Sequence, residues 1–245
     1  MIIDHTHVFY RRRWALAGVV RHNGAYYYSK EIVENIIPKI KTDRPWVTIN
    51  VPGACEDRAI VFIHNNVNMN RYAWLKDYKD LILVCGVPET CEKVKHLGTP
   101  VYLPLSIDVE YVKTYAAPKT KEVAFVGRAD KKTDLLPEGI DCIENLPRSE
   151  LLKEMAKYKK IYGVGRVALE AKALGCEILP YDPRFPDPSF WTLYDNSEVI
   201  GILQKAIDDI DKPKKGKKKN GGRKKDNRVV LPKREENTDH GKASE

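Results

Sequence analysis

Residues 163–182 combine the residue types of a ligand-binding turn with those of a helix and a strand. Gly163 and Gly165 permit a tight turn and allow a ligand to approach the backbone closely. Apolar residues at helical spacing then predict a short helix, and Gly175 stands where a C-cap glycine belongs. Residues 177–181 predict a short buried strand. The stretch therefore predicts a glycine turn that leads into a helix of an α/β unit.

Glu170 is the only acid in that helix. It lies at the edge of the apolar stripe, whereas Lys172 points the opposite way. The start of a helix favours anions because its peptide dipoles and free N–H groups point outward. A half-buried acid beside a phosphate-binding turn could bind a ribose hydroxyl. The alternative is a stabilising glutamate on an ordinary helix, and these residues alone do not decide between the two.

Length and composition predict a protein with a substantial hydrophobic core. The 245 residues suit one large or two small domains, and 42% of them are hydrophobic. No apolar run approaches the roughly 20 residues that span a membrane. The first residues lack the basic and apolar regions of a signal peptide, so we expect a cytoplasmic protein. Five scattered cysteines without a C-x-x-C pair predict neither a disulfide framework nor a zinc site.

The net charge of +8 is concentrated near the C-terminus. Nine of the fourteen residues from 212 to 225 are basic, so the rest of the chain is close to neutral. Few apolar residues occur in 211–245, which we expect to be a disordered basic tail. Such a run can be merely solvated, or it can bind nucleic-acid backbones or anionic membrane surfaces. We favour nucleic acid over membrane because no amphipathic anchor adjoins the tail.

The first half predicts a parallel sheet. Ser29 is a reasonable N-cap for a helix in which Pro38 causes a kink or an early stop. A turn at Asn23-Gly24-Ala25 precedes that helix, and a second helix is expected at 88–97. Continuous apolar strands between helices indicate a parallel sheet that is covered on both faces. The expected strands are 2–10, 46–51, 59–64, 80–85 and 99–105.

The second half repeats this pattern from about Pro118. Arg128, Lys131 and Lys132 follow its first strand at the carboxyl end, where ligands bind in open α/β sheets. Ser149 is the expected N-cap of a helix that ends near Tyr158. The expected strands are 122–127, 140–143 and 159–162, and a final amphipathic helix spans 199–210.

Several segments, taken in order, resemble one enzyme family. Residues 103–108 (Leu-Pro-Leu-Ser-Ile-Asp) are similar to its "pro-asn-gly-ile-asp" segment, and 125–128 (Phe-Val-Gly-Arg) to its "phe-val-gly-arg" strand. Residues 170–175 (Glu-Ala-Lys-Ala-Leu-Gly) resemble its "glu-ala-met-ala-cys-gly" motif, and 23–25 (Asn-Gly-Ala) its Gly-Gly-Ala turn. The family is that of the GT-B glycosyltransferases, in particular the large retaining family that uses sugar nucleotides. The resemblance covers about residues 20–205.

The resemblance implies a role for each matching residue. Arg128, together with Lys132 or Lys131, would neutralise the diphosphate of a nucleotide-sugar donor, and Glu170 would bind its ribose. Gly24 would face the donor phosphates, and His64 would lie near the reacting carbon. The turn itself adds Gly165 and Arg166 as donor contacts. For Arg128 and His64, a solvent-exposed arginine and an internally hydrogen-bonded histidine are the structural alternatives.

Other side chains near the first turn are weaker candidates. His22 precedes the Asn23-Gly24 pair, and Tyr26, Tyr27 and Tyr28 could stack on a sugar or base. No Asp-x-Asp metal signature has supporting context. We therefore expect transfer without a metal or a separate cofactor, with the nucleotide sugar as substrate and with Arg and Lys supplying the positive charge.

The resemblance also implies the organisation of the chain. It predicts two small Rossmann-like domains of GT-B type, an acceptor domain at 1–115 and a nucleotide-sugar domain at 116–210. One position departs from the family, because Tyr162 stands where an acid is usual, eight residues before Glu170. The alternative is therefore a catalytically degenerate binder of nucleotides or nucleic acid. The basic tail suggests DNA or a DNA-associated protein as the acceptor, as in some phage enzymes of this kind.

Overall fold

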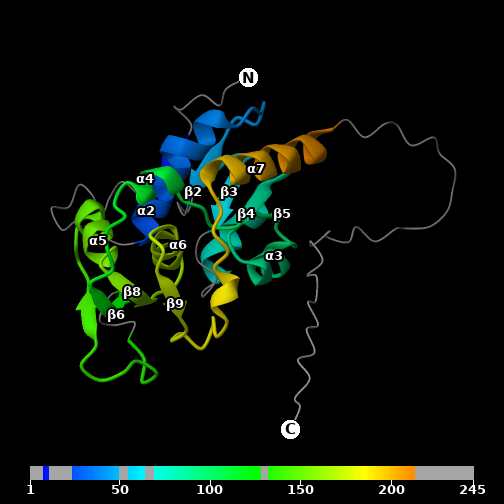
Figure 1. The fold of residues 1–245 in the computed structure, drawn as a ribbon. Coiled ribbons are helices and arrows are strands. Elements are labelled where there is room, and N and C mark those ends of the chain that lie inside the picture. Colours follow the sequence, from blue (N-terminus) through cyan, green and yellow to red (C-terminus); the bar gives the residue numbers. More distant parts are fainter. Residues whose placement is uncertain (1–7, 11–23, 50–54, 64–68, 128–131, 213–245) are drawn as a thin grey trace, which may run out of the picture. The chain divides into compact units, whose positions relative to one another are not determined.

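The computed structural model describes residues 8–10, 24–49, 55–63, 69–127 and 132–212 (Figure 1). Two β-sheets organise this part of the chain, and all their strand pairs are parallel. The expected α/β class is therefore confirmed, and two parallel sheets are consistent with two Rossmann-like units. Both sheets belong to a compact unit that ends at Asp211.

The first sheet has five strands in sequential order. Every residue of its second, third and fourth strands is buried, as the continuous apolar runs predicted. The order contains no reversal. The strands are β1 (Val8–Tyr10), β2 (Val47–Ile49), β3 (Ile60–Ile63), β4 (Ile82–Cys85) and β5 (Thr99–Tyr102).

Helical segments cover both faces of this sheet, as expected. Successive strand residues alternate between the faces, so Ile60 and Phe62 pack into one core while Val61 and Ile63 pack into another. The first core contains residues of α2 (Gly24–Glu31), η2 (Ile32–Ile36) and α7 (Asn196–Asp211). The second contains residues of η4 (Met69–Asp77) and α3 (Pro88–Val94).

The second sheet has four strands in the order β7-β6-β8-β9. From β6 the chain first adds β7 on one side and then crosses to the other side to add β8. The strand order therefore reverses between β6 and β8. Ala124, Val126, Ile161 and Ile178 share a core with helices α5 and α6. The elements are β6 (Lys121–Val126), β7 (Asp141–Ile143), α5 (Arg148–Met155), β8 (Tyr158–Tyr162), α6 (Arg166–Ala173) and β9 (Glu177–Leu179).

Two helices begin earlier than predicted. Helix α2 starts at Gly24, so Gly24 and Ala25 are helical rather than part of a turn, and Ser29 lies inside the helix. Helix α5 starts at Arg148, because the Pro147 carbonyl accepts the first helical bond from Leu151, and Ser149 is not its N-cap. The N-cap is Pro147, which has an extended backbone (φ −52°, ψ 146°) and makes no side-chain cap hydrogen bond.

The expected effect of Pro38 is confirmed. After Glu31 the helix continues as the π-helical segment η2 and then as the 3₁₀ turn η3 (Ile37–Lys39), where it ends. Proline removes a donor from the helical ladder and clashes with the preceding turn. Three further segments were not predicted: η4 (Met69–Asp77), α4 (Val109–Lys113) and η6 (Pro188–Phe190).

Helix α7 follows the second sheet in sequence but packs on the first. Its buried residues Val199, Leu203 and Ile207 belong to the core of the first sheet. The division at residues 115 and 116 stays a prediction. Residues 213–245 lie outside the described part of the chain. Within the part described, no helix combines the length and apolarity needed to cross a membrane.

Candidate functional site

The carboxyl edge of the second sheet brings two glycine-containing turns together. Strand β6 ends at Val126 and is followed by Gly127, while β8 ends at Tyr162 and is followed by Gly163. These two strands are hydrogen-bonded neighbours, and the strand order reverses between them. In open parallel sheets, ligands bind outside the carboxyl ends of the strands at such a reversal. This edge is therefore the candidate site.

The turn before α6 requires glycine at two positions for different reasons. A Cβ on Gly163 would lie 2.6 Å from Cγ1 of Val167, so only glycine lets the helix pack this closely on the strand. Gly165, the N-cap of α6, has φ +65° and ψ −135°, a conformation that side chains disfavour. Among the described residues beyond its two chain neighbours, no heavy atom lies within 4 Å of a Cβ built on Gly165, so this side of the turn is open.

Glu170 is more deeply buried than its half-buried position in the sequence pattern suggested. Its relative exposure is 2%. Its Oε1 accepts a hydrogen bond from Nε of Arg166 at 2.7 Å and forms an ion pair with Nε of Arg148 at 3.1 Å. This carboxylate therefore faces two guanidinium groups in the described structure.

Arg166, the first residue of α6, turns toward protein groups. Its Nη2 donates to Oε2 of Glu31 at 2.8 Å, and its Nη1 donates to the backbone oxygen of Tyr27 at 3.2 Å. The side chain is 6% exposed. Arg166 was predicted to contact phosphate. In the structure its guanidinium is bonded to two carboxylates instead, one from its own helix and one from α2.

Glu31 was not identified as a site residue from the sequence. It is 4% exposed, and its Oε1 accepts from the side-chain amides of Asn35 and Asn196, both at 2.6 Å. Asn196 in turn accepts from the hydroxyl of Ser106 at 2.9 Å. Nη1 of Arg148 lies 3.4 Å from Oε2 of Glu31.

We call Glu31, Arg148, Arg166 and Glu170 the charge cluster. Two carboxylates and two guanidinium groups make it formally neutral. Burial alone would raise the pKa of Glu31, but the charge and hydrogen bond of Arg166, with the amides of Asn35 and Asn196, lower that pKa below its ordinary value. Glu31 therefore stays ionised at neutral pH despite its burial.

Arg148 is enclosed by tyrosines. Its guanidinium carbon lies 6.0 Å from the ring centroid of Tyr27 and 5.2 Å from that of Tyr111. These distances suit cation–π attraction, which favours arginine over aromatic faces. Nε of Arg148 meets Glu170 as an ion pair at 3.1 Å without hydrogen-bond geometry, and its Nη2 has no hydrogen-bond acceptor among the described residues. Tyr111 is 39% exposed, and its hydroxyl lies 2.9 Å from that of Tyr115.

The charge cluster joins elements of both sheets at the candidate edge. Arg148 and Arg166 are the first residues of α5 and α6, which follow the carboxyl ends of β7 and β8. Glu31 ends α2, which packs on the first sheet. Figure 1 shows α2 beside α6, in agreement with their contacts. The carboxylate of Glu31, from a helix that packs on the first sheet, therefore contacts the first residues of two helices of the second sheet.

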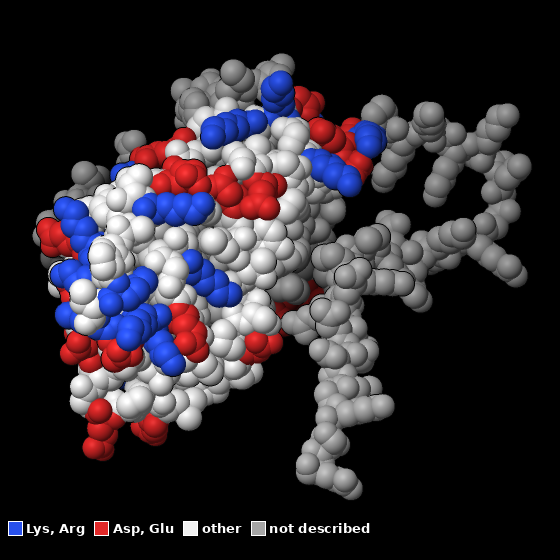
Figure 2. All heavy atoms as spheres, viewed as in Figure 1, with Lys and Arg blue, Asp and Glu red and all other residues white. Residues whose placement is uncertain are grey.

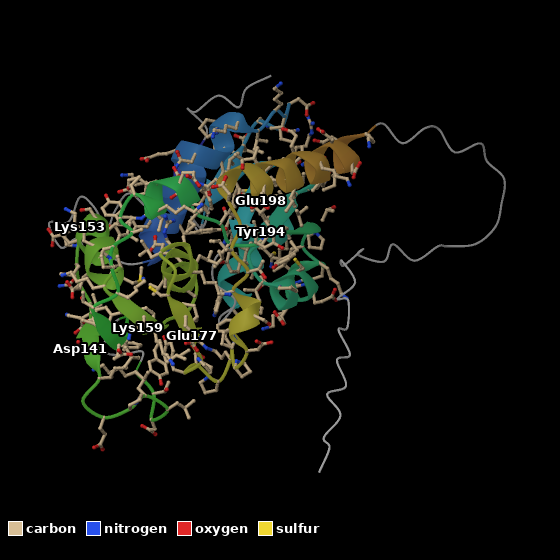
Figure 3. The ribbon with its side chains drawn as sticks, viewed as in Figure 1. Asp141, Lys153, Lys159, Glu177, Tyr194 and Glu198 are labelled. Carbon is tan, nitrogen blue, oxygen red and sulfur yellow. The ribbon has the colours of Figure 1, made fainter. Side chains whose placement is uncertain are left out.

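The opposite, amino edge of the second sheet carries surface ion pairs. Asp141, Lys159 and Glu177 lie at or next to the starts of β7, β8 and β9 (Figure 3). Lys159 pairs with Glu122 at 2.5 Å, and Lys160 pairs with Glu177 at 3.4 Å. Figure 2 shows acidic and basic side chains intermixed on this face of the molecule. Each of these exposed ion pairs contributes little to stability, and the mixed signs do not form a patch of uniform charge.

Four of the predicted site residues are not tested by the described geometry. Lys132 is exposed, and contact with Cys142 raises its pKa. Gly24 is the first residue of α2. His64 and Arg128 lie outside the described residues, as do Lys131 and His22. Among the described residues, no three His, Cys, Asp or Glu side chains are grouped to hold a metal ion.

Comparison of the chain with protein-family models, curated proteins and solved structures finds no significant match. The geometry of the candidate edge is therefore the basis for a functional proposal, together with the sequence motifs.

Proposed function

We propose that this chain is a glycosyltransferase of GT-B type that binds a nucleotide-sugar donor at the carboxyl edge of its second sheet. One observation carries the proposal. The strand order reverses between β6 and β8, and this reversal lies beside a glycine turn that opens a helix. Backbone N–H groups at such a helix start attract a diphosphate. The open space beside Gly165 leaves room for a ligand to approach.

The remaining roles follow from the sequence motifs. Arg128 and Lys132 follow β6 and would neutralise the charge that develops on the departing nucleotide diphosphate. His64 would lie near the reacting sugar carbon. The nucleotide sugar is the substrate, and no separate cofactor is part of this proposal. Positively charged side chains would take the place of a metal ion.

Calorimetric titration with UDP, GDP and their sugar conjugates tests donor binding. Micromolar to millimolar affinity for one nucleotide, improved by the attached sugar, is the expected outcome. A folded protein that binds none of these ligands would contradict the proposal.

Glu170 has two candidate roles that one variant separates. If Glu170 binds ribose, it contacts the nucleoside part of the ligand. If it only holds Arg166, it affects the start of α6, where the diphosphate would bind. Glu170→Gln keeps the side-chain shape. If Glu170 binds ribose, the variant should weaken UDP binding about tenfold and leave inorganic pyrophosphate binding unchanged. Equal losses for both ligands would remove Glu170 from the ribose site and assign it to Arg166.

The second candidate function is a nucleotide binder without transferase activity. Tyr162 ends β8 where the resembling family has an acid, and the ion pairs of Glu170 engage one of its oxygens. Nucleotide binding without donor hydrolysis or transfer to any acceptor tested would favour this function over catalysis.

DNA or a DNA-associated protein is the proposed acceptor, and the motivation is the basic run at 212–225. Deleting 212–245 should lower DNA affinity and flatten its salt dependence. A deletion that left both unchanged would end the DNA proposal and leave donor binding unaffected.

A further inference from the structure

We propose that Glu31 is a positioning residue for the phosphate-binding edge of the second sheet. This inference rests on the proposed function, because it concerns the same helix starts. Glu31 belongs to α2 and is supported by the first sheet, yet it bonds to the first residues of both α5 and α6. The donor site would therefore depend on a carboxylate supplied by the other half of the molecule.

The location of the two arginines creates the need for such a residue. A cation at the start of a helix is repelled by the positive end of the helix dipole. Arg148 and Arg166 both occupy that position. Glu170 offsets part of the repulsion, but it lies on the same helix as Arg166 and can move with it. Glu31 approaches from outside both helices, so it can fix them relative to the first sheet.

The surroundings of Glu31 make it a rigid anchor. Asn35 holds it from the next turn of its own helical segment, and Asn196 holds it from the first residue of α7. Ser106 then fixes Asn196. All these groups except Asn35 are less than 9% exposed. A carboxylate with hydrogen bonds from several elements cannot rotate without losing buried bonds. It therefore holds the groups that bind it at fixed positions relative to one another.

Positioning and simple charge effects predict opposite results for the neutral variant Glu31→Gln. If Glu31 acted only through its charge, removing a negative charge near an anion site would tighten anion binding. If Glu31 positions the helix starts, its loss would loosen the turn at 163–165 and weaken binding. The geometry points to the second result, because Glu31 contacts the first residues of both α5 and α6.

The experiment measures the affinity of the full chain for inorganic pyrophosphate by calorimetry. Glu31→Gln should bind about tenfold more weakly than the wild type, a loss typical of removing an outer partner of a binding group. Asp211→Asn is the matched control. Asp211 pairs at 2.7 Å with Arg44, whose side chain is fully buried, at the far end of α7. This control also removes a carboxylate that pairs with a buried arginine, and it should keep wild-type affinity.

Hydrogen exchange of the ligand-free proteins gives the second measurement. Peptides that cover residues 163–169 should exchange faster in Glu31→Gln than in the wild type, and they should be unchanged in Asp211→Asn. Equal or tighter pyrophosphate binding by Glu31→Gln would overturn the inference while leaving the proposed function intact. If the wild type binds neither pyrophosphate nor nucleotides, both fall. If Glu31→Gln does not fold, Glu31→Asp replaces it, because it keeps the charge and shortens the reach. Unchanged affinity and exchange in that variant would equally overturn the inference.

Discussion

Glu31 shows how one buried carboxylate can remain charged and connect several elements. Its position in the sequence carries a signal of a buried ion pair. Tyr28, Ile32 and Ile36 form a buried stripe on α2 and η2, and Glu31 lies inside that stripe. An acid within an apolar stripe needs a cationic partner, so Glu31 predicts a buried arginine elsewhere. The sequence does not say which arginine, because Arg148 and Arg166 meet it only through the tertiary fold.

Acid should destabilise the protein partly through Glu31. Its pKa in the folded protein lies below the ordinary value, so the unfolded chain takes up the proton first as the pH falls. The stabilisation is complete above the ordinary carboxyl pKa of about 4.3 and is lost as the pH falls through the lower folded pKa. Glu31→Gln should be about 3 kcal/mol less stable at pH 7 and should lose less further stability on acidification.

Urea unfolding at pH 7, 4 and 3 measures this dependence. Parallel stability curves for Glu31→Gln and the wild type across these pH values would show that Glu31 does not contribute to acid unfolding.

The strands and the helices differ in how well the sequence defines them. Continuous apolar runs located β2, β3 and β4 because both faces of these strands are buried. The segment η4 was missed because asparagines dominate the sequence before it, although Tyr72 and Leu75 are buried beneath the sheet. Helix α4 was also missed, since only five residues are helical. Two side chains accept from its first turn, Asp108 from the Tyr111 N–H at 2.9 Å and the distant Asp195 from the Val109 N–H at 3.2 Å.

The start of α6 illustrates what the sequence could specify at the element scale. The glycines at both ends were identified, and Gly175, which follows the C-cap Leu174, has the left-handed φ of +75° typical of that position. The orientation of the helix was not predictable, because it depends on Arg166 reaching α2. The candidate edge was therefore foreseeable from the glycines and strand ends, and the ion pairs that occupy it were not.

Two glycine-to-alanine variants should change stability in opposite directions. Gly165→Ala forces a side chain into φ +65° at the start of α6 and should destabilise the protein by about 1–3 kcal/mol. Gly201→Ala lies inside α7, where no described atom outside the local helix backbone lies within 4 Å of the added methyl group, and should stabilise by about 0.5–1 kcal/mol. Thermal unfolding measured by circular dichroism compares them. A neutral Gly165→Ala would mean that this turn relaxes at no cost.

At the scale of the whole described unit, the chain crosses between the sheets twice at one place. The chain leaves the first sheet near Ile107 and returns to it near Asp195. These two residues form an isolated parallel β-bridge. The backbone N–H of Asn196 then donates to the carbonyl of Ile107 at 3.1 Å. Tyr194 and Glu198 flank the start of α7 (Figure 3). This pairing directs α7 onto the first sheet, and nothing in its own amphipathic pattern identified which sheet it would cover.

The packing of α7 should make the two sheets unfold together. Leu203 is 1% exposed in the core of the first sheet, whereas its neighbour Ile202 is 39% exposed. Leu203→Ala should cost about 2–4 kcal/mol, and Ile202→Ala should stay within about 0.5 kcal/mol of the wild type. Hydrogen exchange should show β4 and β8 losing protection together in Leu203→Ala. Loss of protection in β4 alone would show that the sheets unfold independently.

The return of α7 also sets an order of events during synthesis. A ribosome makes the strands of the first sheet well before it makes residues 196–211, whose buried side chains complete that sheet's core. Domains usually fold as soon as they emerge, but here the earlier half must wait for the last described helix. Until then, the face that carries Ile60, Phe62 and Val84 lacks part of its cover. We therefore expect chaperones to bind the nascent chain through this apolar face until residues 196–211 have been made.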